Sequence, residues 1–87
     1  MTPTKKQRER WSKIASLGCI ICASPAEIHH CFTGAGGRKN HDKVIPLCPE
    51  HHRGKNGIDG RHLSKRQWQD IYGSEQELLD RINRLVD

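Results

Sequence analysis

Two groups of cysteine and histidine residues have the types and the spacing needed to bind metal ions. The first consists of two pairs with two residues between their members, Cys19 with Cys22 and Cys48 with His51. A tetrahedral zinc ion takes four sulfur or nitrogen ligands, commonly supplied as two such pairs. These residues are therefore predicted to form a closed, structural zinc site. Cys31 is an alternative fourth ligand, but the local Cys-x2-His spacing favours His51.

The second group combines the adjacent residues His29 and His30 with His52, which directly follows the second zinc pair. Neighbouring residues of a strand point to opposite faces, so adjacent histidines ordinarily do not bind the same ion. The pair therefore indicates a division of labour, in which one imidazole binds a divalent ion and the other takes a proton from water. Imidazole has a pKa of about 6.5 and suits the second role near neutral pH. This combination predicts metal-assisted hydrolysis of a phosphodiester.

The size and composition of the chain favour a small protein stabilised by metal. It has 87 residues, of which 33% are hydrophobic, with a single Phe and a single Tyr. A chain of this length buries only about 60% of the surface that it exposes when unfolded. Its hydrophobic core is therefore only marginally stable without a bound metal ion or a disulfide. Residues 1–87 are accordingly predicted to form a single domain.

The four cysteines are interpreted as reduced thiols in a cytoplasmic protein. Two disulfides in a secreted protein are the alternative. However, residues 1–6 are polar and lead into no apolar stretch of the kind that a signal peptide contains. No segment approaches the ~20 apolar residues of a membrane span, so no membrane partner is expected.

Positive charge is concentrated in residues 1–73. The net charge of the whole chain is +5, but residues 74–87 hold four acids and two bases, which leaves 13 bases and six acids in the rest. Such an excess favours a polyanionic partner, because each phosphate contact releases counterions. The alternative is a basic surface that only keeps the protein soluble. Nucleic acid is therefore the expected partner.

A small α+β fold is predicted, with the metal-binding residues on a unit of two strands and a short helix. This core is expected to span residues 18–60. Its strands are predicted over residues 27–32 and 44–47, because both segments are short, partly β-branched and bounded by turn residues. Pro49 fits the first turn of the short helix that carries the second zinc pair.

Helices are predicted on both sides of this core. Residues 1–17 are expected to form a basic helix with Thr2 as its N-cap and Gly18 as its terminator. Residues 61–87 are expected to form a helical pair, and two capping-box patterns mark where its helices begin. These patterns are Ser64-x-x-Gln67 and Ser74-x-x-Glu77. The last helix is interpreted as scaffold, with a single apolar stripe formed by Leu78, Leu79, Ile82, Leu85 and Val86.

The order of these motifs resembles that of the HNH, or His-Me finger, nucleases, which share a ββα-metal core. The span from residue 17 to residue 72 is particularly similar to the phage Ref-type recombination-enhancing nucleases, whose cleavage depends on RecA filaments. The likeness rests on LGCIIC at 17–22, IHH at 28–30, KVIPLCPEHH at 43–52 and GIDG at 57–60. It implies a zinc-stapled ββα-metal fold, a DNA substrate, a RecA filament as a further partner, and a phage or prophage protein acting in the bacterial host.

The resemblance also assigns roles to individual histidines. His29 and His52 would bind the catalytic divalent ion, which could be Mg²⁺, Mn²⁺ or Zn²⁺, and His30 would be the general base. A third ligand is expected from Asn56, one helical turn after His52, or from His62.

Lys43 occupies the position where HNH enzymes usually have the middle Asn of their motif. Lysine cannot restrain the base as Asn does, but Asn40 or His41 could, and Lys43 would then be available to contact phosphate. Basic side chains around the predicted ion are expected to bind DNA. They are Arg38, Lys39, Lys43, Arg53 and Lys55.

The predicted function is that of a metal-dependent HNH endonuclease that leaves 5′-phosphate and 3′-hydroxyl ends. Two alternatives stay open at this point. The chain could be a zinc module that binds DNA without cutting it, or an adaptor whose C-terminal apolar stripe joins a partner.

Overall fold

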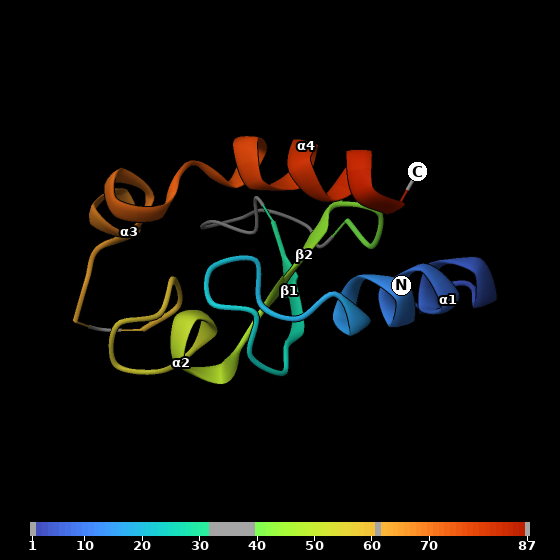
Figure 1. Ribbon diagram of the computed structural model, residues 1–87, viewed down its shortest axis with the longest axis horizontal. Coiled ribbons are helices and arrows are strands. Elements are labelled where there is room, and N and C mark those ends of the chain that lie inside the picture. The colour runs from blue at the N-terminus through green and yellow to red at the C-terminus, as the bar shows by residue number, and fades with distance from the viewer. Residues whose placement is uncertain (1, 32–39, 61, 87) are drawn as a thin grey trace.

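The computed structural model describes residues 2–31, 40–60 and 62–86, and these residues form a small α+β fold. Two short strands lie at its centre, with helices around them (Figure 1). The element types and their order agree with the sequence-based expectation. In chain order the elements are α1 (Lys5–Ser16), β1 (Glu27–His30), β2 (Val44–Leu47), α2 (Pro49–His52), α3 (Lys65–Tyr72) and α4 (Glu75–Val86).

Strands β1 and β2 form a two-stranded antiparallel sheet that leads directly into α2. The register pairs His29 with Ile45. All four residues of β2 are buried, whereas in β1 only His29 is. β1 ends at His30, and Phe32 of the longer predicted strand lies outside the described residues. The unit β1–β2–α2 therefore has the strand–strand–helix order that the sequence predicts.

Helix α1 begins later than the sequence-based expectation, because its N-cap is Thr4 rather than Thr2. The Thr4 hydroxyl accepts a hydrogen bond from the Gln7 N–H at 3.1 Å, and the Gln7 side chain accepts one from the Thr4 N–H at 2.8 Å. This reciprocal pair satisfies two donors that a helix start otherwise leaves without partners. The helix ends at Ser16, and Gly18 has a φ of +81°, which glycine adopts without strain.

Helix α1 is fixed to the segment that precedes β2. The Trp11 indole N–H donates to the His41 carbonyl at 2.8 Å. Arg10 donates to the Asp42 carbonyl at 3.3 Å, and the Gln7 amide donates to the Asp42 carboxylate at 3.1 Å. These bonds use one basic side chain of α1, and four other basic side chains of the helix are exposed. They are Lys5, Lys6, Arg8 and Lys13.

Helices α3 and α4 begin where the capping patterns predict. The Ser64 hydroxyl accepts from the Gln67 N–H at 3.1 Å, and the Gln67 side chain accepts from the Ser64 N–H at 2.9 Å. Ser74 also accepts from the Glu77 N–H at 3.1 Å, and its hydroxyl donates to the Glu77 carboxylate at 3.1 Å. No helix in the described part of the chain is long and apolar enough to cross a bilayer.

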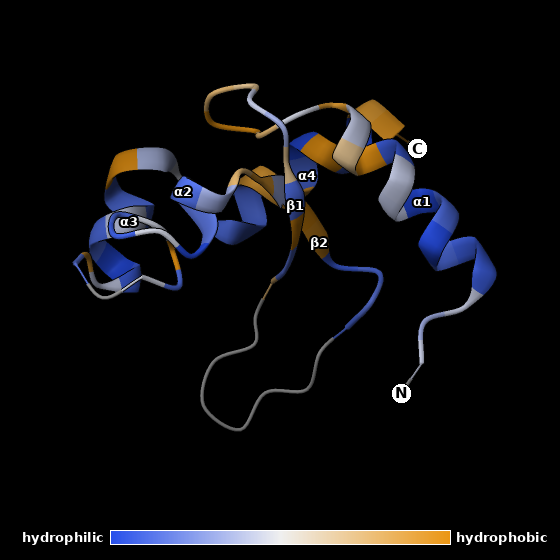
Figure 2. Ribbon diagram, turned by 90° about the horizontal axis from the view of Figure 1, so that it is seen from below, coloured by the Kyte–Doolittle hydropathy of each residue, from blue (hydrophilic) through white to orange (hydrophobic). Residues whose placement is uncertain are grey.

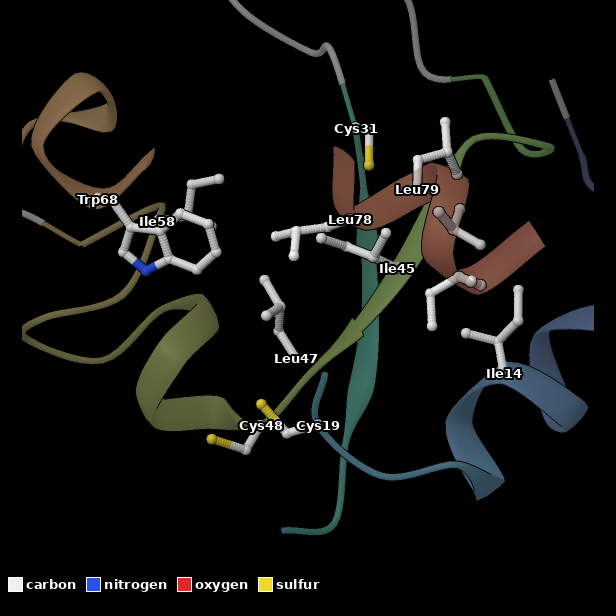
Figure 3. Packing of buried hydrophobic residues seen from close by; sticks show 12 residues of the cluster. Ile14, Cys19, Cys31, Ile45, Leu47, Cys48, Ile58, Trp68, Leu78 and Leu79 are labelled. Carbon is white, nitrogen blue, oxygen red and sulfur yellow. The ribbon is translucent and has the colours of Figure 1, made fainter. Parts of the chain in front are cut away.

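The core lies where α4 and α1 pack against the sheet, with Trp68 of α3 buried at one end (Figure 3). Figure 2 shows the contrast between the hydrophobic β2 and the largely hydrophilic α1. Leu78 and Ile82 of α4 are each 1% exposed, as the predicted apolar stripe requires. Leu85 is 64% exposed, so the apolar stripe is only partly buried. With 3.6 residues per turn, Leu85 lies at the edge of a stripe that centres near Ile82.

Candidate metal centres

Cys19, Cys22, Cys48 and His51 come together in the structure as a cluster that could hold a metal ion, as the sequence predicts. Cys48 Sγ lies 3.1 Å from His51 Nδ1 and 3.7 Å from Cys22 Sγ, and Cys19 Sγ lies 3.7 Å from His51 Nδ1. Two sulfurs bound to a tetrahedral zinc ion at about 2.3 Å are about 3.8 Å apart. The four side chains are thus positioned to bind a metal ion, and their donor set fits zinc.

A tight turn presents the first cysteine pair. The Ala23 N–H donates to the Cys19 carbonyl at 2.8 Å, and the Cys19 N–H donates to the Ser24 carbonyl at 2.8 Å. Hydrogen bonds from the side chain and backbone of Ser24 lower the pKa of Cys22 to about 6. The thiolate is the form that binds zinc, so this turn favours metal binding near neutral pH.

The remaining cysteine, Cys31, lies apart from the cluster of Cys19, Cys22, Cys48 and His51. Figure 3 shows it at the opposite end of the sheet from Cys19 and Cys48. It is 1% exposed, and burial, with a smaller effect of the Glu75 carboxylate, raises the pKa of its thiol to about 12. A thiol that stays protonated is a poor zinc ligand. The placement therefore favours His51 over Cys31 as the fourth ligand.

His29 and His52 meet Asp59 in a second cluster. Asp59 Oδ2 lies 3.1 Å from His52 Nε2 and 3.5 Å from His29 Nδ1. His29 is 2% exposed and Asp59 is 52% exposed, so the cluster is closed behind His29 and meets solvent at Asp59. Two imidazole nitrogens and one carboxylate oxygen with solvent on one side are a donor set typical of catalytic metal sites.

A loop after α2 turns back to place Asp59 beside His52. The Asp59 N–H donates to the His52 carbonyl at 2.8 Å, and the Ile58 N–H donates to the His51 carbonyl at 2.9 Å. A Cβ at Gly57 would lie 2.6 Å from the His52 carbonyl oxygen. Glycine is required at such a close approach of two backbone segments. The glycine therefore allows the loop to return along α2 and deliver Asp59 to the cluster.

On its other side, His29 faces a buried acid from α4. Glu75 Oε2 lies 3.5 Å from His29 Nε2, and Glu75 Oε1 lies 2.7 Å from Lys65 Nζ. Glu75 is 2% exposed. The interpretation of α4 as scaffold is therefore incomplete, because its first residue reaches the cluster. His29 lies between two carboxylates, with Asp59 at one ring nitrogen and Glu75 at the other.

His52 has a comparable second partner. Its Nδ1 lies 3.6 Å from Glu27 Oε2, while Glu27 Oε1 accepts a hydrogen bond from Arg53 Nε at 3.0 Å. That hydrogen bond is the main reason that the pKa of Glu27 lies below its usual value. Arg53, expected to contact DNA, is thus engaged with Glu27, although 68% of its side chain is exposed.

His30 lies on the other face of β1 from His29. Its Nε2 is 3.0 Å from His41 Nδ1, and the Trp11 ring meets the His30 ring edge-on at 5.3 Å between centroids. The strand alternation that separates neighbouring side chains is the physical cause. The structure therefore brings His29 and His52 together and gives His30 a different set of neighbours, His41 and Trp11.

Two residues were expected as a third ligand, and of these only His62 is of a type that can be compared with the cluster. Asn56 and His62 both have exposed side chains. Among the described residues, the cluster around His29 and His52 includes Asp59 and does not include His62.

The basic residues expected to bind DNA are only partly described. Lys43 is exposed directly before β2, and Lys55 is exposed in the loop after α2. Arg38 and Lys39 lie outside the described residues.

Sequence reasoning missed the three acids of this centre, Glu27, Asp59 and Glu75. The signal for Asp59 was present, because Gly57 and Gly60 flank it and glycines at this spacing favour a loop that folds back on itself. Glu75 carried no comparable signal, since an acid in the first turn of a helix already suits the helix dipole.

The chain is similar to a known protein family over almost its whole length. Residues 3–87 match the family described as recombination enhancement, RecA-dependent nuclease. The match spans both metal-binding clusters and all six helices and strands of the described structure. No curated protein is similar enough to the chain to count as a match.

Proposed function

The chain belongs to the family of recombination-enhancing, RecA-dependent nucleases, and from this premise we propose that it is an HNH-type, metal-dependent endonuclease that hydrolyses DNA. The observation that carries the proposal is the cluster of His29, His52 and Asp59. His29 and His52 lie on the β1–β2–α2 unit, which has the element order of a ββα-metal core, and Asp59 lies in the loop after α2.

The donor atoms of this cluster fit a divalent ion such as Mg²⁺, Mn²⁺ or Zn²⁺. Ligands at about 2.1 Å from an ion are about 3.0 Å apart in octahedral geometry and about 3.4 Å apart in tetrahedral geometry. The Asp59 oxygen lies 3.1 Å and 3.5 Å from the nitrogens of His52 and His29. An ion bound there would stabilise the negative charge that develops on the phosphate and on the departing oxygen.

His30 is assigned the role of general base. It would take a proton from water while the water oxygen attacks phosphorus and the bond from phosphorus to the 3′-oxygen breaks, which leaves 5′-phosphate and 3′-hydroxyl ends. The His41 ring, 3.0 Å from His30 Nε2, would hold the base in place. His41 thus takes the restraining role that the middle Asn has in HNH enzymes and that Lys43 cannot perform.

The substrate has to reach both faces of β1, because His29 and His30 point to opposite sides. Within the described residues the sheet has only two strands, so β1 has an edge where its two faces meet. A DNA strand lying across that edge would place one phosphodiester between the ion site and His30. Exposed basic residues would then hold the flanking backbone. They are Lys43, Arg53, Lys55 and the four exposed basic residues of α1, together with Arg38 and Lys39 from the sequence.

DNA associated with a RecA filament is the proposed substrate, in keeping with the family. The experiment is cleavage of supercoiled plasmid by the zinc-loaded protein with Mn²⁺ or Mg²⁺, in the presence and absence of a RecA filament. We expect nicked product that depends on the added divalent ion and increases with the filament. Binding to DNA without nicking under every condition would contradict the proposal.

That outcome would instead support a zinc module that binds DNA without cutting it. The observation that favours this second function is the separation of His30 from His29, since His30 contacts His41 and Trp11 on the far face of β1.

Replacing the proposed base tests the assignment more narrowly. His30→Ala is expected to lower the rate of nicking at least 100-fold, in line with the typical contribution of a general base. Zinc content and Mn²⁺ affinity should stay as in the wild-type protein, because His30 belongs to neither cluster. Wild-type nicking by this variant would remove His30 from the base role.

A further inference from the structure

The acid at the start of α4 has an unusual environment for a carboxylate. Glu75 is 2% exposed, although acids are almost never buried unless they are paired. Its Oε1 pairs with Lys65 Nζ at 2.7 Å, and its Oε2 faces His29 Nε2 at 3.5 Å. Cys31 provides a further polar neighbour through its thiol. Burying this charge is costly, so its position beside His29 calls for an explanation.

We propose that Glu75 is a positioning residue that orients His29 for metal binding, which rests on the ion proposed at His29, His52 and Asp59. Metal-binding histidines commonly donate their second ring N–H to a carboxylate, which fixes both the ring and its tautomer. The Glu75 carboxylate, 3.5 Å from His29 Nε2, would favour a proton on that nitrogen, which has no hydrogen-bond partner among the described residues. The lone pair of Nδ1 then points toward Asp59, where the ion would sit.

Lys65 has a different role from Glu75 in this arrangement. Lys65, 41% exposed, neutralises Glu75 from the side away from His29 and keeps a buried negative charge from standing alone. If the acid served only to anchor α3 to α4, its contact with Lys65 would be sufficient. The Glu75 carboxylate also lies beside the Cys31 thiol and 3.5 Å from His29 Nε2, so its contacts extend beyond α3.

Glu27 stands in the same relation to His52, with weaker contacts. Its oxygen lies 3.6 Å from His52 Nδ1, and Glu27 is 33% exposed and paired with Arg53. Water competes with such an exposed carboxylate, so its effect on metal binding should be smaller than that of the buried Glu75.

The test compares two variants that break the same ion pair. Glu75→Gln removes the carboxylate beside His29, whereas Lys65→Met leaves it in place. Mn²⁺ binding to the zinc-loaded proteins is measured by titration calorimetry, with Asp80→Asn, an exposed acid on the same helix, as the matched control. We expect Glu75→Gln to weaken Mn²⁺ binding about tenfold or more. Asp80→Asn should bind Mn²⁺ within about threefold of the wild-type protein. Lys65→Met should lose less Mn²⁺ affinity than Glu75→Gln, because it keeps the carboxylate beside His29.

Equal Mn²⁺ affinity for Glu75→Gln and wild type would overturn the proposal. An equal loss in Glu75→Gln and Lys65→Met would do so as well, because it would show that the ion pair acts only through the scaffold. Absence of Mn²⁺ binding in the wild-type protein would overturn the proposed function itself. The two failures are therefore distinguishable in one experiment.

A second measurement needs no variant and covers the case in which Glu75→Gln fails to fold. Nitrogen-15 NMR of the imidazole rings distinguishes which ring nitrogen carries the proton. In wild-type protein loaded with zinc at the cysteine cluster, His29 is expected to carry its proton on Nε2. A proton on Nδ1 would overturn the positioning role of Glu75.

Discussion

Replacing Cys48 with serine should test whether the zinc cluster is required for the fold. Cys48 Sγ is the sulfur closest to His51 Nδ1, at 3.1 Å, and it also lies 3.7 Å from Cys22 Sγ. The side chain is 6% exposed, so water cannot easily take its place. The same residue is the N-cap of α2, so loss of this ligand removes a link between the first cysteine pair and the β1–β2–α2 unit.

The expected magnitude follows from the size of the protein. Domains are stabilised by roughly 0.05–0.15 kcal/mol per residue, or about 4–13 kcal/mol for a chain of this length. Structural zinc contributes about 10–16 kcal/mol of apparent binding free energy at neutral pH. The binding free energy of zinc is therefore as large as the net free energy of unfolding. Cys48→Ser is expected to lose zinc and to be largely unfolded at 25 °C.

Cys31→Ser provides the matched control, because Cys31 is also buried but lies outside the zinc cluster. It should retain one zinc ion and lose about 1 kcal/mol, which corresponds to a Tm lower by about 4–8 °C in a domain of this size. The assay is zinc analysis by mass spectrometry together with thermal melting followed by circular dichroism. Cooperative melting of zinc-free Cys48→Ser within a few degrees of wild type would refute the reasoning.

Two further predictions concern the loop after α2 and Cys31, the buried cysteine outside the cluster of Cys19, Cys22, Cys48 and His51. Gly57→Ala places a Cβ 2.6 Å from the His52 carbonyl, which should displace the loop that carries Asp59. The variant should be less stable by about 1–3 kcal/mol in denaturant unfolding and should bind Mn²⁺ more weakly. Unchanged Mn²⁺ affinity would contradict this prediction. The pKa of Cys31 is raised to about 12 in the folded protein, so its contribution to stability should be complete below pH ~9 and disappear as the pH rises toward 12. The free energy of unfolding of Cys31→Ala should therefore fall less between about pH 9 and pH 12 than that of the wild-type protein. An identical fall in both proteins would show that Cys31 is not its source.

The cluster of Cys19, Cys22, Cys48 and His51 and the starts of α3 and α4 could be predicted from the sequence because they depend on local spacing. The pair of Cys19 and Cys22 is held within one turn, as the bonds between Cys19, Ala23 and Ser24 show. The capping box at Ser64 likewise involves residues only three apart. A capping box also explains why α1 has Thr4 rather than Thr2 as its N-cap. Gln7 completes the box with Thr4, and the Thr2 position has no such partner.

The acids around the second cluster could not be predicted in the same way because tertiary contacts place them. Asp59 reaches His52 only after the intervening loop has folded back, whereas the sequence offered Asn56 or His62 as the third ligand. Glu75 reaches His29 because α4 packs across the sheet, which brings together residues far apart in the chain. Strand alternation did predict that His29 and His30 point to opposite faces.

The most direct test of the central claim is the Mn²⁺ dependence of DNA cleavage by Asp59→Asn. The substitution keeps the size of the side chain and removes the negative charge that lies 3.1 Å from His52 Nε2 and 3.5 Å from His29 Nδ1. Zinc content should remain unchanged, because Asp59 is outside the cysteine cluster. The Mn²⁺ concentration for half-maximal cleavage is expected to rise at least about tenfold. Cleavage by Asp59→Asn with the same Mn²⁺ dependence as the wild-type protein would contradict an ion held by these three residues.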